Sequence, residues 1–318
     1  MRAESKIMLP GLLFIFLLFV GCGKRQKEKP LFSLQEKTGI EFVNTIQNSP
    51  DFNIFSYRNF YNGGGVAIGD INNDGLADIF FTANMGANKL YLNKGGWQFD
   101  DISVKAGFVD KKDWSTGVIF VDINHDGWLD IFVCNAGYVD GKKPKCQLFI
   151  NNKDLTFTDK AAEYGLTNEG GYTTHAAFFD YDADGDLDCF IINNSFIPVN
   201  TLNYANKRGL RDPDWPVAEF LKGGGDHLLR NDNGKFTDVS KEAGIYGSLI
   251  SFGLGVTVGD VNGDHYPDIY VSNDFFERDY LYVNQKDGTF KDEIEDWVQH
   301  MSHSSMGADM ADINNDGY

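Results

Sequence analysis

Short apolar runs alternate with polar turns along most of the chain, and the order of these runs repeats. A first run, such as "TGVIFV" (116–121), precedes an Asp- and Asn-rich motif of nine residues, and a second run, such as "DIFVCN" (130–135), follows it. Two further runs then flank a Gly, Asn or Asp turn, as in "LYLNKGGWQFDD" (90–101). Aromatic and β-branched runs of this length are typical of β-strands. The pattern therefore predicts a repeated unit of four antiparallel strands.

The spacing of the repeats supports this unit. The motif begins at positions 70, 122, 180, 260 and 312, and each of the four hairpins contains a landmark asparagine: Asn93, Asn151, Asn231 or Asn284. Each asparagine precedes the next motif by 28 or 29 residues, whereas the distance from a motif to its own asparagine varies from 23 to 51. A four-stranded repeat of about 50 residues is the signature of a β-propeller blade. We therefore expect an all-β propeller over 31–318, with its length variation between the second and third strands of each blade.

The two ends of this region bear on how such a propeller would close. The stretch "LFSLQEKTGI" (31–40) is similar to the end of each repeat, so we expect it to add an outer strand to the last blade and close the ring. The sequence stops inside the fifth motif, at "DINNDGY". We therefore expect a truncated propeller of four blades and the start of a fifth, out of about seven in the complete protein.

The first 22 residues have a different character. Arg2 and Lys6 precede an apolar run of fourteen residues, which is too short to span a bilayer but suits a signal peptide. The run ends in a pattern that resembles the lipobox of bacterial lipoproteins, so we expect Cys22 to be lipidated and 23–30 to be a polar tether. This predicts an exported protein anchored to the bacterial envelope by lipid alone, at the outer membrane, in the periplasm or at the surface. An ordinary cleaved signal peptide with an incidental cysteine is the alternative.

Charge narrows the possible partners. The formal net charge is −18, which argues against nucleic acid as a partner because a nucleic-acid-binding face is basic. A surplus of carboxylates instead favours bound cations.

The nine-residue motif has the pattern of a calcium loop. Acceptor side chains stand at positions 1, 3, 5 and 9, position 7 offers its carbonyl, and glycine at position 6 permits the positive φ of a sharp turn, although His265 replaces it in the fourth motif. An EF-hand needs glutamate at position 12, where this chain has Phe81, Val133, Ile191 and Val271. Turns that close without an ion are the alternative. The predicted ligands, for about one Ca²⁺ per complete motif, are Asp70, Asn72, Asp74, Leu76 and Asp78; Asp122, Asn124, Asp126, Trp128 and Asp130; Asp180, Asp182, Asp184, Asp186 and Asp188; Asp260, Asn262, Asp264, Tyr266 and Asp268; and, in the incomplete fifth motif, Asp312, Asn314 and Asp316.

The motif and its flanking strands resemble the FG-GAP repeat of integrin α-subunit propellers and its bacterial relatives, the VCBS-repeat proteins. The stretch "FGLGVTVGDVNGDHYPDIYV" (252–271) is especially similar, and "NDNGKFTDVSKEAGI" (231–245) is similar to the hairpin of bacterial proteins with an ASPIC/UnbV domain. The resemblance covers 31–318, which does not include that domain. It implies a cell-adhesion or recognition scaffold that binds its partner on the face away from calcium.

Successive strands reverse direction, so the irregular connections would lie on the face opposite the acidic motifs. The longest of them, 194–225, is expected to bind a ligand, because long loops on rigid scaffolds commonly carry binding. A role in pinning the loop to its neighbours is the alternative for its aromatic and basic residues. The candidate ligand-binding residues are Tyr204, Lys207, Arg208, Arg211, Trp215 and Phe220.

Other candidate residues have two interpretations each. His175, His300 and His303 precede inner strands and would form a metal or catalytic cluster at the channel mouth, or else be structural or solvated. Cys134 and Cys146 flank one connection and would staple it by a disulfide or remain free. Cys189 stands at an apolar strand position, which predicts a buried thiol.

No catalytic constellation is evident in the sequence. We therefore expect a non-enzymatic scaffold that binds an unknown protein or glycan. The alternative is a polysaccharide-processing enzyme, or an enzyme-associated module, with active residues at the channel mouth or in a C-terminal region beyond this sequence.

Overall fold

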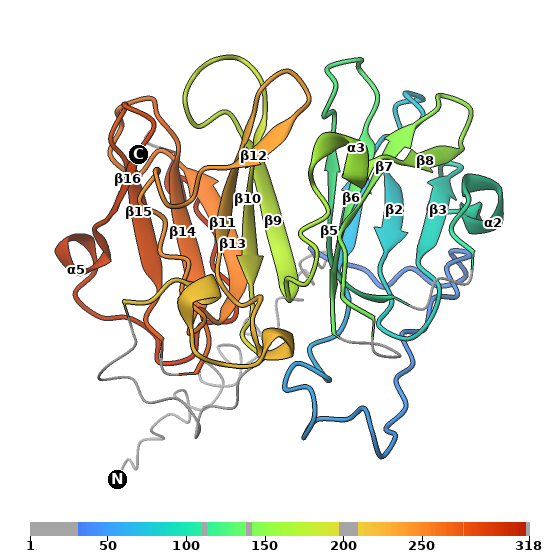
Figure 1. Ribbon diagram of the computed structural model, residues 1–318. Coiled ribbons are helices and arrows are strands. Elements are labelled where there is room, and N and C mark those ends of the chain that lie inside the picture. The colour runs from blue at the N-terminus through green and yellow to red at the C-terminus, as the bar shows by residue number, and fades with distance from the viewer. Residues whose placement is uncertain (1–30, 110–112, 138–141, 197–208, 276, 316–318) are drawn as a thin grey trace, which may run out of the picture. The chain divides into compact units, whose positions relative to one another are not determined.

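The computed structural model describes residues 31–109, 113–137, 142–196, 209–275 and 277–315 (Figure 1). The chain divides into two units, Met1–Glu36 and Lys37–Tyr318, and the sheets belong to the second unit. The predicted signal peptide, Cys22 and the tether lie outside the described residues. In the described part of the chain, no helix is long and apolar enough to cross a membrane.

The described residues form four antiparallel sheets of four strands, and the strands of each sheet are adjacent in chain order. The repeated four-stranded unit is thus confirmed. The sheets consist of β1 (Val66–Gly69), β2 (Asp78–Phe81), β3 (Lys89–Asn93) and β4 (Phe99–Asp101); β5 (Trp114–Val121), β6 (Asp130–Ala136), β7 (Gln147–Asn151) and β8 (Phe157–Asp159); β9 (Thr173–Phe179), β10 (Asp188–Asn193), β11 (His227–Asn231) and β12 (Phe236–Asp238); and β13 (Gly253–Gly259), β14 (Asp268–Asn273), β15 (Tyr280–Asn284) and β16 (Phe290–Asp292).

The first strands of successive sheets lie next to one another, which makes the arrangement propeller-like. Two glycines permit this close approach. A Cβ on Gly65 would lie 2.8 Å from the Thr116 carbonyl oxygen, and a Cβ on Gly117 would lie 2.6 Å from the Thr174 carbonyl oxygen. Any larger residue there would push neighbouring inner strands apart.

The core lies between the sheets. Apolar side chains on facing strands form one buried cluster between each pair of successive sheets, and these clusters include Phe80 and Phe149, then Phe132 and Leu166, then Phe190 and Tyr282. Removal of this apolar surface from water is the main force that holds the sheets together.

Short helices extend the units at their outer edges. The one-turn helices α2 (Ser103–Ala106), α3 (Ala161–Tyr164) and α5 (Ile294–Trp297) follow β4, β8 and β16. The long connection between β10 and β11 contains two 3₁₀ turns, η3 (Asp212–Asp214) and η4 (Glu219–Leu221).

Residues 31–40 contain no strand in the structure, and the described sheets do not include the last blade that this segment is expected to complete, so the closing strand stays a prediction. The Thr38 carbonyl accepts a hydrogen bond from the Phe99 N–H at 2.8 Å, and a Cβ on Gly39 would lie 2.3 Å from the Phe99 carbonyl. Gly244 meets Phe290 in the same way, with a corresponding distance of 2.6 Å. Residues 38–40 thus contact the first sheet as the tail of one repeat contacts the next. They contact the start of β4 but form no strand ladder with it.

Candidate functional site

The acidic loops, 70–78, 122–130, 180–188 and 260–268, connect the first and second strands of the sheets and share one hydrogen-bond pattern. Asp70 Oδ1 accepts the Asp74 N–H at 3.1 Å, and Asp70 Oδ2 accepts the Gly75 N–H at 2.7 Å. Asp74 Oδ1 accepts the Leu76 N–H at 2.9 Å. The same three bonds recur around Asp122, Asp180 and Asp260. The backbone amides therefore draw each loop around its own carboxylates.

The carboxylate at position 9 is fully buried in every complete loop, at Asp78, Asp130, Asp188 and Asp268. Each accepts two backbone N–H groups; Asp188, for example, accepts those of Asn231 at 2.8 Å and Tyr181 at 3.1 Å. Burial raises the pKa of Asp188 to about 7, and the neighbouring Asp182 and Asp184 carboxylates add to the rise. Burial likewise raises the pKa of Asp130 to about 6. Each loop thus concentrates negative charge around a desolvated carboxyl.

The third loop fits a cation most clearly. One carboxylate oxygen each from Asp180, Asp182 and Asp188 lies within 4.8 Å of the other two. Asp182 Oδ1 is buried and has no hydrogen-bond partner. A cluster made only of hard oxygen donors suits Ca²⁺ better than transition metals.

Two positions of each acidic loop adopt positive φ, one more than the sequence predicted. The expected position 6 has φ of 86° at Gly75 and 71° at His265, so histidine does take the strained conformation. Position 4 was missed, because its residues share no obvious turn signal. They are Asn73, His125, Ala183, Gly263 and, in the fifth motif, Asn315. The fourth loop therefore places its glycine at position 4 and its histidine at position 6.

The landmark asparagines also belong to this site. Asn151 Nδ2 donates to the carbonyl of Leu129 at 3.1 Å and to that of Ile71, in the acidic loop of the preceding sheet, at 2.9 Å. Asn284 likewise donates to the Tyr181 carbonyl of the preceding sheet at 2.8 Å. Their recurrence at the same place in each hairpin was the signal in the sequence that could have identified a structural role.

Lysines partly balance two of the loops. Lys153 Nζ lies 3.3 Å from Asp126 Oδ2, and Lys286 Nζ lies 3.3 Å from Asp264 Oδ2. Both lysines are about half exposed, so each pair contributes little to stability, about 0–1 kcal/mol. They leave the buried position-9 carboxylates unpaired.

The end of the sheets opposite the acidic loops, the irregular face, carries residues 49–62 with η3 and η4 (Figure 1). Trp215 is only 4% exposed and packs on Leu249 and Ile250. It therefore belongs to the core and pins the connection to its neighbours, in place of the predicted ligand contact. Arg211 Nη1 donates to the Ile245 carbonyl at 2.9 Å and also pins the loop. Phe220 is 53% exposed. The other candidates, Tyr204, Lys207 and Arg208, lie outside the described residues.

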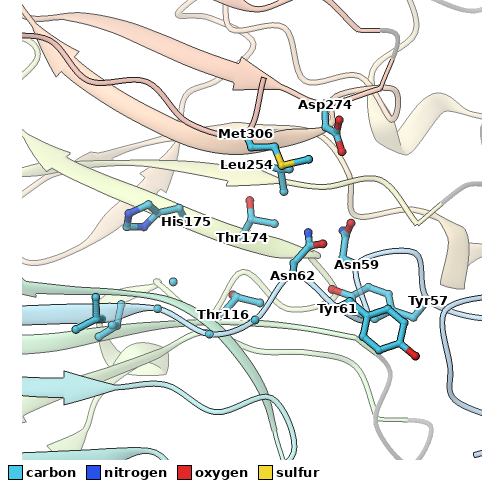
Figure 2. Close-up of a pocket in the computed structure, with 16 residues that line it drawn as sticks. Tyr57, Asn59, Tyr61, Asn62, Thr116, Thr174, His175, Leu254, Asp274 and Met306 are labelled. Carbon is cyan, nitrogen blue, oxygen red and sulfur yellow. The ribbon is translucent and has the colours of Figure 1, made fainter. Parts of the chain in front are cut away.

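An axial cavity of about 510 Å³ opens among the starts of the inner strands. Figure 2 shows its walls, with residues 57–66 on one side and residues of β5, β9 and the fourth sheet around them. Its lining includes Asn59, Tyr61, Thr174, His175 and Asp274. Because inner strands begin on the irregular face, the cavity lies away from the acidic loops.

The three histidines do not assemble into a cluster, which favours the alternative of structural or solvated side chains. His175 lines the axial cavity, and burial lowers the pKa of its imidazole. His300 and His303 are exposed in the segment after α5 and do not line the cavity. The described residues thus provide no histidine metal site.

Cys134 and Cys146 are buried free thiols in the structure, so the possible staple between them is not formed. The Cys146 thiol instead donates to Thr173 Oγ1 at 3.4 Å. Cys189 is a buried free thiol, as expected, and burial raises the pKa of Cys134 and Cys189 well above the ordinary thiol value.

The repeated sheets and their acidic loops define a propeller-like repeat protein. A family model described as FG-GAP-like repeat matches residues 70–133, 212–271 and 266–318, more than half of the chain. The chain therefore belongs to the FG-GAP-like repeat family.

Curated relatives include cartilage acidic protein 1. The Xenopus tropicalis protein is 31% identical over 216 residues, which cover 68% of this chain and 29% of that protein. The Homo sapiens protein is 38% identical over 165 residues, which cover 52% of this chain and 24% of that protein. The chain thus spans less than a third of the length of these relatives.

Solved structures give a weaker likeness. An Agrocybe aegerita lectin that recognises non-reducing terminal N-acetylglucosamine is 18% identical, with a TM-score of 0.36, over 70% of this chain and 49% of the lectin. A rhamnogalacturonan lyase of Bacillus licheniformis is 16% identical, with a TM-score of 0.31, over 70% of this chain and 42% of the lyase. Scores at this level do not establish a shared fold.

Proposed function

We propose that this chain is a calcium-stabilised, non-enzymatic scaffold that recognises a glycan or a protein partner. The contrast between its two faces carries the proposal. The acidic face repeats the same loop in every sheet, as a structural element does. The irregular face holds the variable connections and the axial cavity, and binding commonly resides on such variable loops over a rigid frame. Membership of the FG-GAP-like repeat family supports a recognition role.

Calcium would be held by the side chains at positions 1, 3, 5 and 9 and by the carbonyl at position 7. When bound, it would neutralise carboxylates that otherwise repel one another. Isothermal titration with Ca²⁺, and thermal unfolding with and without EGTA, test this proposal. We expect saturable binding and a melting temperature that falls on chelation. An unchanged melting temperature would overturn it.

The partner is tested by incubating the purified chain with immobilised glycans and with envelope or matrix proteins, in the presence of Ca²⁺. Saturable binding without any chemical change in the ligand supports recognition. Cleavage products would instead support the alternative of a polysaccharide-processing enzyme.

Export and lipid anchoring are a separate part of the proposal, supported by the N-terminal sequence. Bacterial cells that express the chain should carry it in the membrane fraction, and Cys22→Ser should release it. Mass spectrometry of the mature N-terminus checks the lipid directly. A Cys22→Ser protein that stays with the membrane would contradict the lipid anchor.

A further inference from the structure

The axial cavity supports an inference that deepens the proposed recognition function and rests on it. We propose that the cavity binds one neutral, hydroxyl-rich sugar ring of a glycan. Its volume of about 510 Å³ lies within the range of about 300–1,000 Å³ that is usual for small-ligand sites. It is a concave site on the irregular face, separate from the acidic loops.

The charge of the lining excludes anionic ligands. Among the described residues that line the cavity, Asp274 is the one carboxylate and there is no Lys or Arg. The His175 pKa is lowered by burial, so the imidazole is neutral at pH 7. An anion entering this cavity would meet a carboxylate and no positive charge, in a protein with a net charge of −18.

Hydrogen-bonding capacity separates a sugar from a cation. Asp274 Oδ1 accepts the Phe275 N–H at 2.7 Å, and the carboxylate has further acceptor capacity. Asn59 is 5% exposed, and its Nδ2 donor has no partner. Burial raises the pKa of the Tyr57 hydroxyl, and the nearby Asn59 amide partly opposes this rise. The two groups nevertheless do not form a hydrogen bond of normal geometry.

His175 Nδ1 is likewise buried without a partner. An ammonium or guanidinium ligand offers only donors, so it would satisfy Asp274 and leave the Asn59 amide unpaired. A hydroxyl both donates and accepts, so the hydroxyls of one ring can serve the Asp274 carboxylate and the Asn59 amide. Leaving such buried groups unpaired costs about 1–3 kcal/mol each, which favours a ligand that pairs all of them.

An aromatic ring stands at the edge of the cavity. Tyr61 is 58% exposed, and its position is fixed because the Asn48 amide donates to its hydroxyl at 3.0 Å and Phe60 packs edge-on with ring centroids 5.1 Å apart. Figure 2 shows Tyr61 beside Asn59 and Asn62 on the same loop. A sugar presents apolar C–H groups on its ring faces, and an exposed aromatic ring can cover them.

The loop that carries these residues is held from several sides, so the site is preorganised. Tyr57 packs on Trp114 and Tyr172, with ring centroids 5.6 and 6.2 Å away. The Arg58 guanidinium lies 4.8 Å from the centre of the Phe275 ring. These contacts tie residues 57–61 to the second, third and fourth sheets, which reduces the ordering cost of binding.

The test titrates the full chain with methyl glycosides of glucose, galactose, mannose and N-acetylglucosamine, followed by saturation-transfer NMR and calorimetry. Methyl glucuronide and methylammonium serve as the anionic and cationic probes. We expect a neutral glycoside to bind most tightly. Binding should weaken about tenfold or more in Asp274→Ala and in Tyr61→Ala, because a hydrogen bond to a charged group and an aromatic contact are lost. Asp51→Ala, an exposed carboxylate on the same loop, is the matched control and should change affinity less than twofold.

Two results would overturn the inference: preferred binding of the anionic or the cationic probe, or affinities in Asp274→Ala and Tyr61→Ala equal to that of the unchanged protein. Thermal melts confirm that the variants fold, and the half-exposed Tyr61 provides a variant that spares the core. Glycan or protein binding that persists in both variants would refute the cavity as the binding site and would leave the proposed recognition function intact. Absence of any partner in the earlier screen would refute that function instead.

Discussion

Replacing Asn151 by alanine tests whether the landmark asparagines join neighbouring sheets. The buried Asn151 side chain donates to the carbonyls of Ile71 and Leu129, and its Oδ1 accepts the Lys153 N–H at 2.9 Å. Alanine removes all three bonds at once. Ile71 is itself almost fully buried, so its carbonyl gains little from water after the change.

The expected cost follows from the groups left unpaired. A buried polar group that loses its partner costs about 1–3 kcal/mol. The Ile71 carbonyl bears this cost in full and that of the half-buried Leu129 only in part, so we expect Asn151→Ala to lower the free energy of unfolding by about 2–4 kcal/mol. For a domain of this size, each kcal/mol corresponds to about 2–4 °C, which gives a fall of about 4–16 °C in melting temperature.

Two variants serve as controls, with thermal and urea unfolding measured in buffer that contains Ca²⁺. Within the described residues Asn93 Nδ2 donates to the Ala77 carbonyl of its own sheet alone, so Asn93→Ala should cost roughly half as much or less. Asn152 lies on the same turn as Asn151 but is exposed, and Asn152→Ala should change stability by less than about 0.5 kcal/mol. Equal losses for Asn93→Ala and Asn151→Ala would refute the bond between sheets as the cause.

Three further predictions concern other parts of the molecule. Asp188→Asn should lower the number of Ca²⁺ ions bound in calorimetry, because it removes a carboxylate from the third loop, and an unchanged stoichiometry would contradict this. Trp215→Ala should cost about 3–5 kcal/mol by opening a cavity, whereas Phe220→Ala should cost less than about 1 kcal/mol; equal urea midpoints for the two would argue against a core role for Trp215. Burial lowers the pKa of His175, so the unfolded chain binds a proton more readily than the folded chain does. Stability should therefore fall as the pH drops below about 6.5. His175→Gln should make this pH dependence less steep in urea midpoints measured between pH 5 and 8. An identical slope in the variant would show that His175 does not contribute.

The repeating parts of the fold could be predicted from the sequence, because each strand and acidic loop occurs four times with a constant pattern. The path of 49–62 could not. It has no counterpart in the other repeats, and its place depends on contacts of Tyr57 and Arg58 with three different sheets.

Single aromatic residues posed a related difficulty. Trp215 in a long polar connection has the composition of a binding residue, yet it is buried, while Tyr61 lines the cavity and carried no signal in the sequence. Sequence alone does not distinguish an aromatic ring that fills a core from one that faces a ligand, because the difference lies in which distant segments surround it.

The bonds between landmark asparagines and neighbouring acidic loops have a consequence for how such proteins diversify. In two of the sheets the asparagine is hydrogen-bonded to the acidic loop of the preceding sheet. An insertion on the face that carries the acidic loops would therefore break a contact between sheets. An insertion in the connection between the second and third strands breaks none of these contacts. Repeats copied and altered over time can therefore change one face freely while the other stays the same, which gives one stable frame many possible specificities.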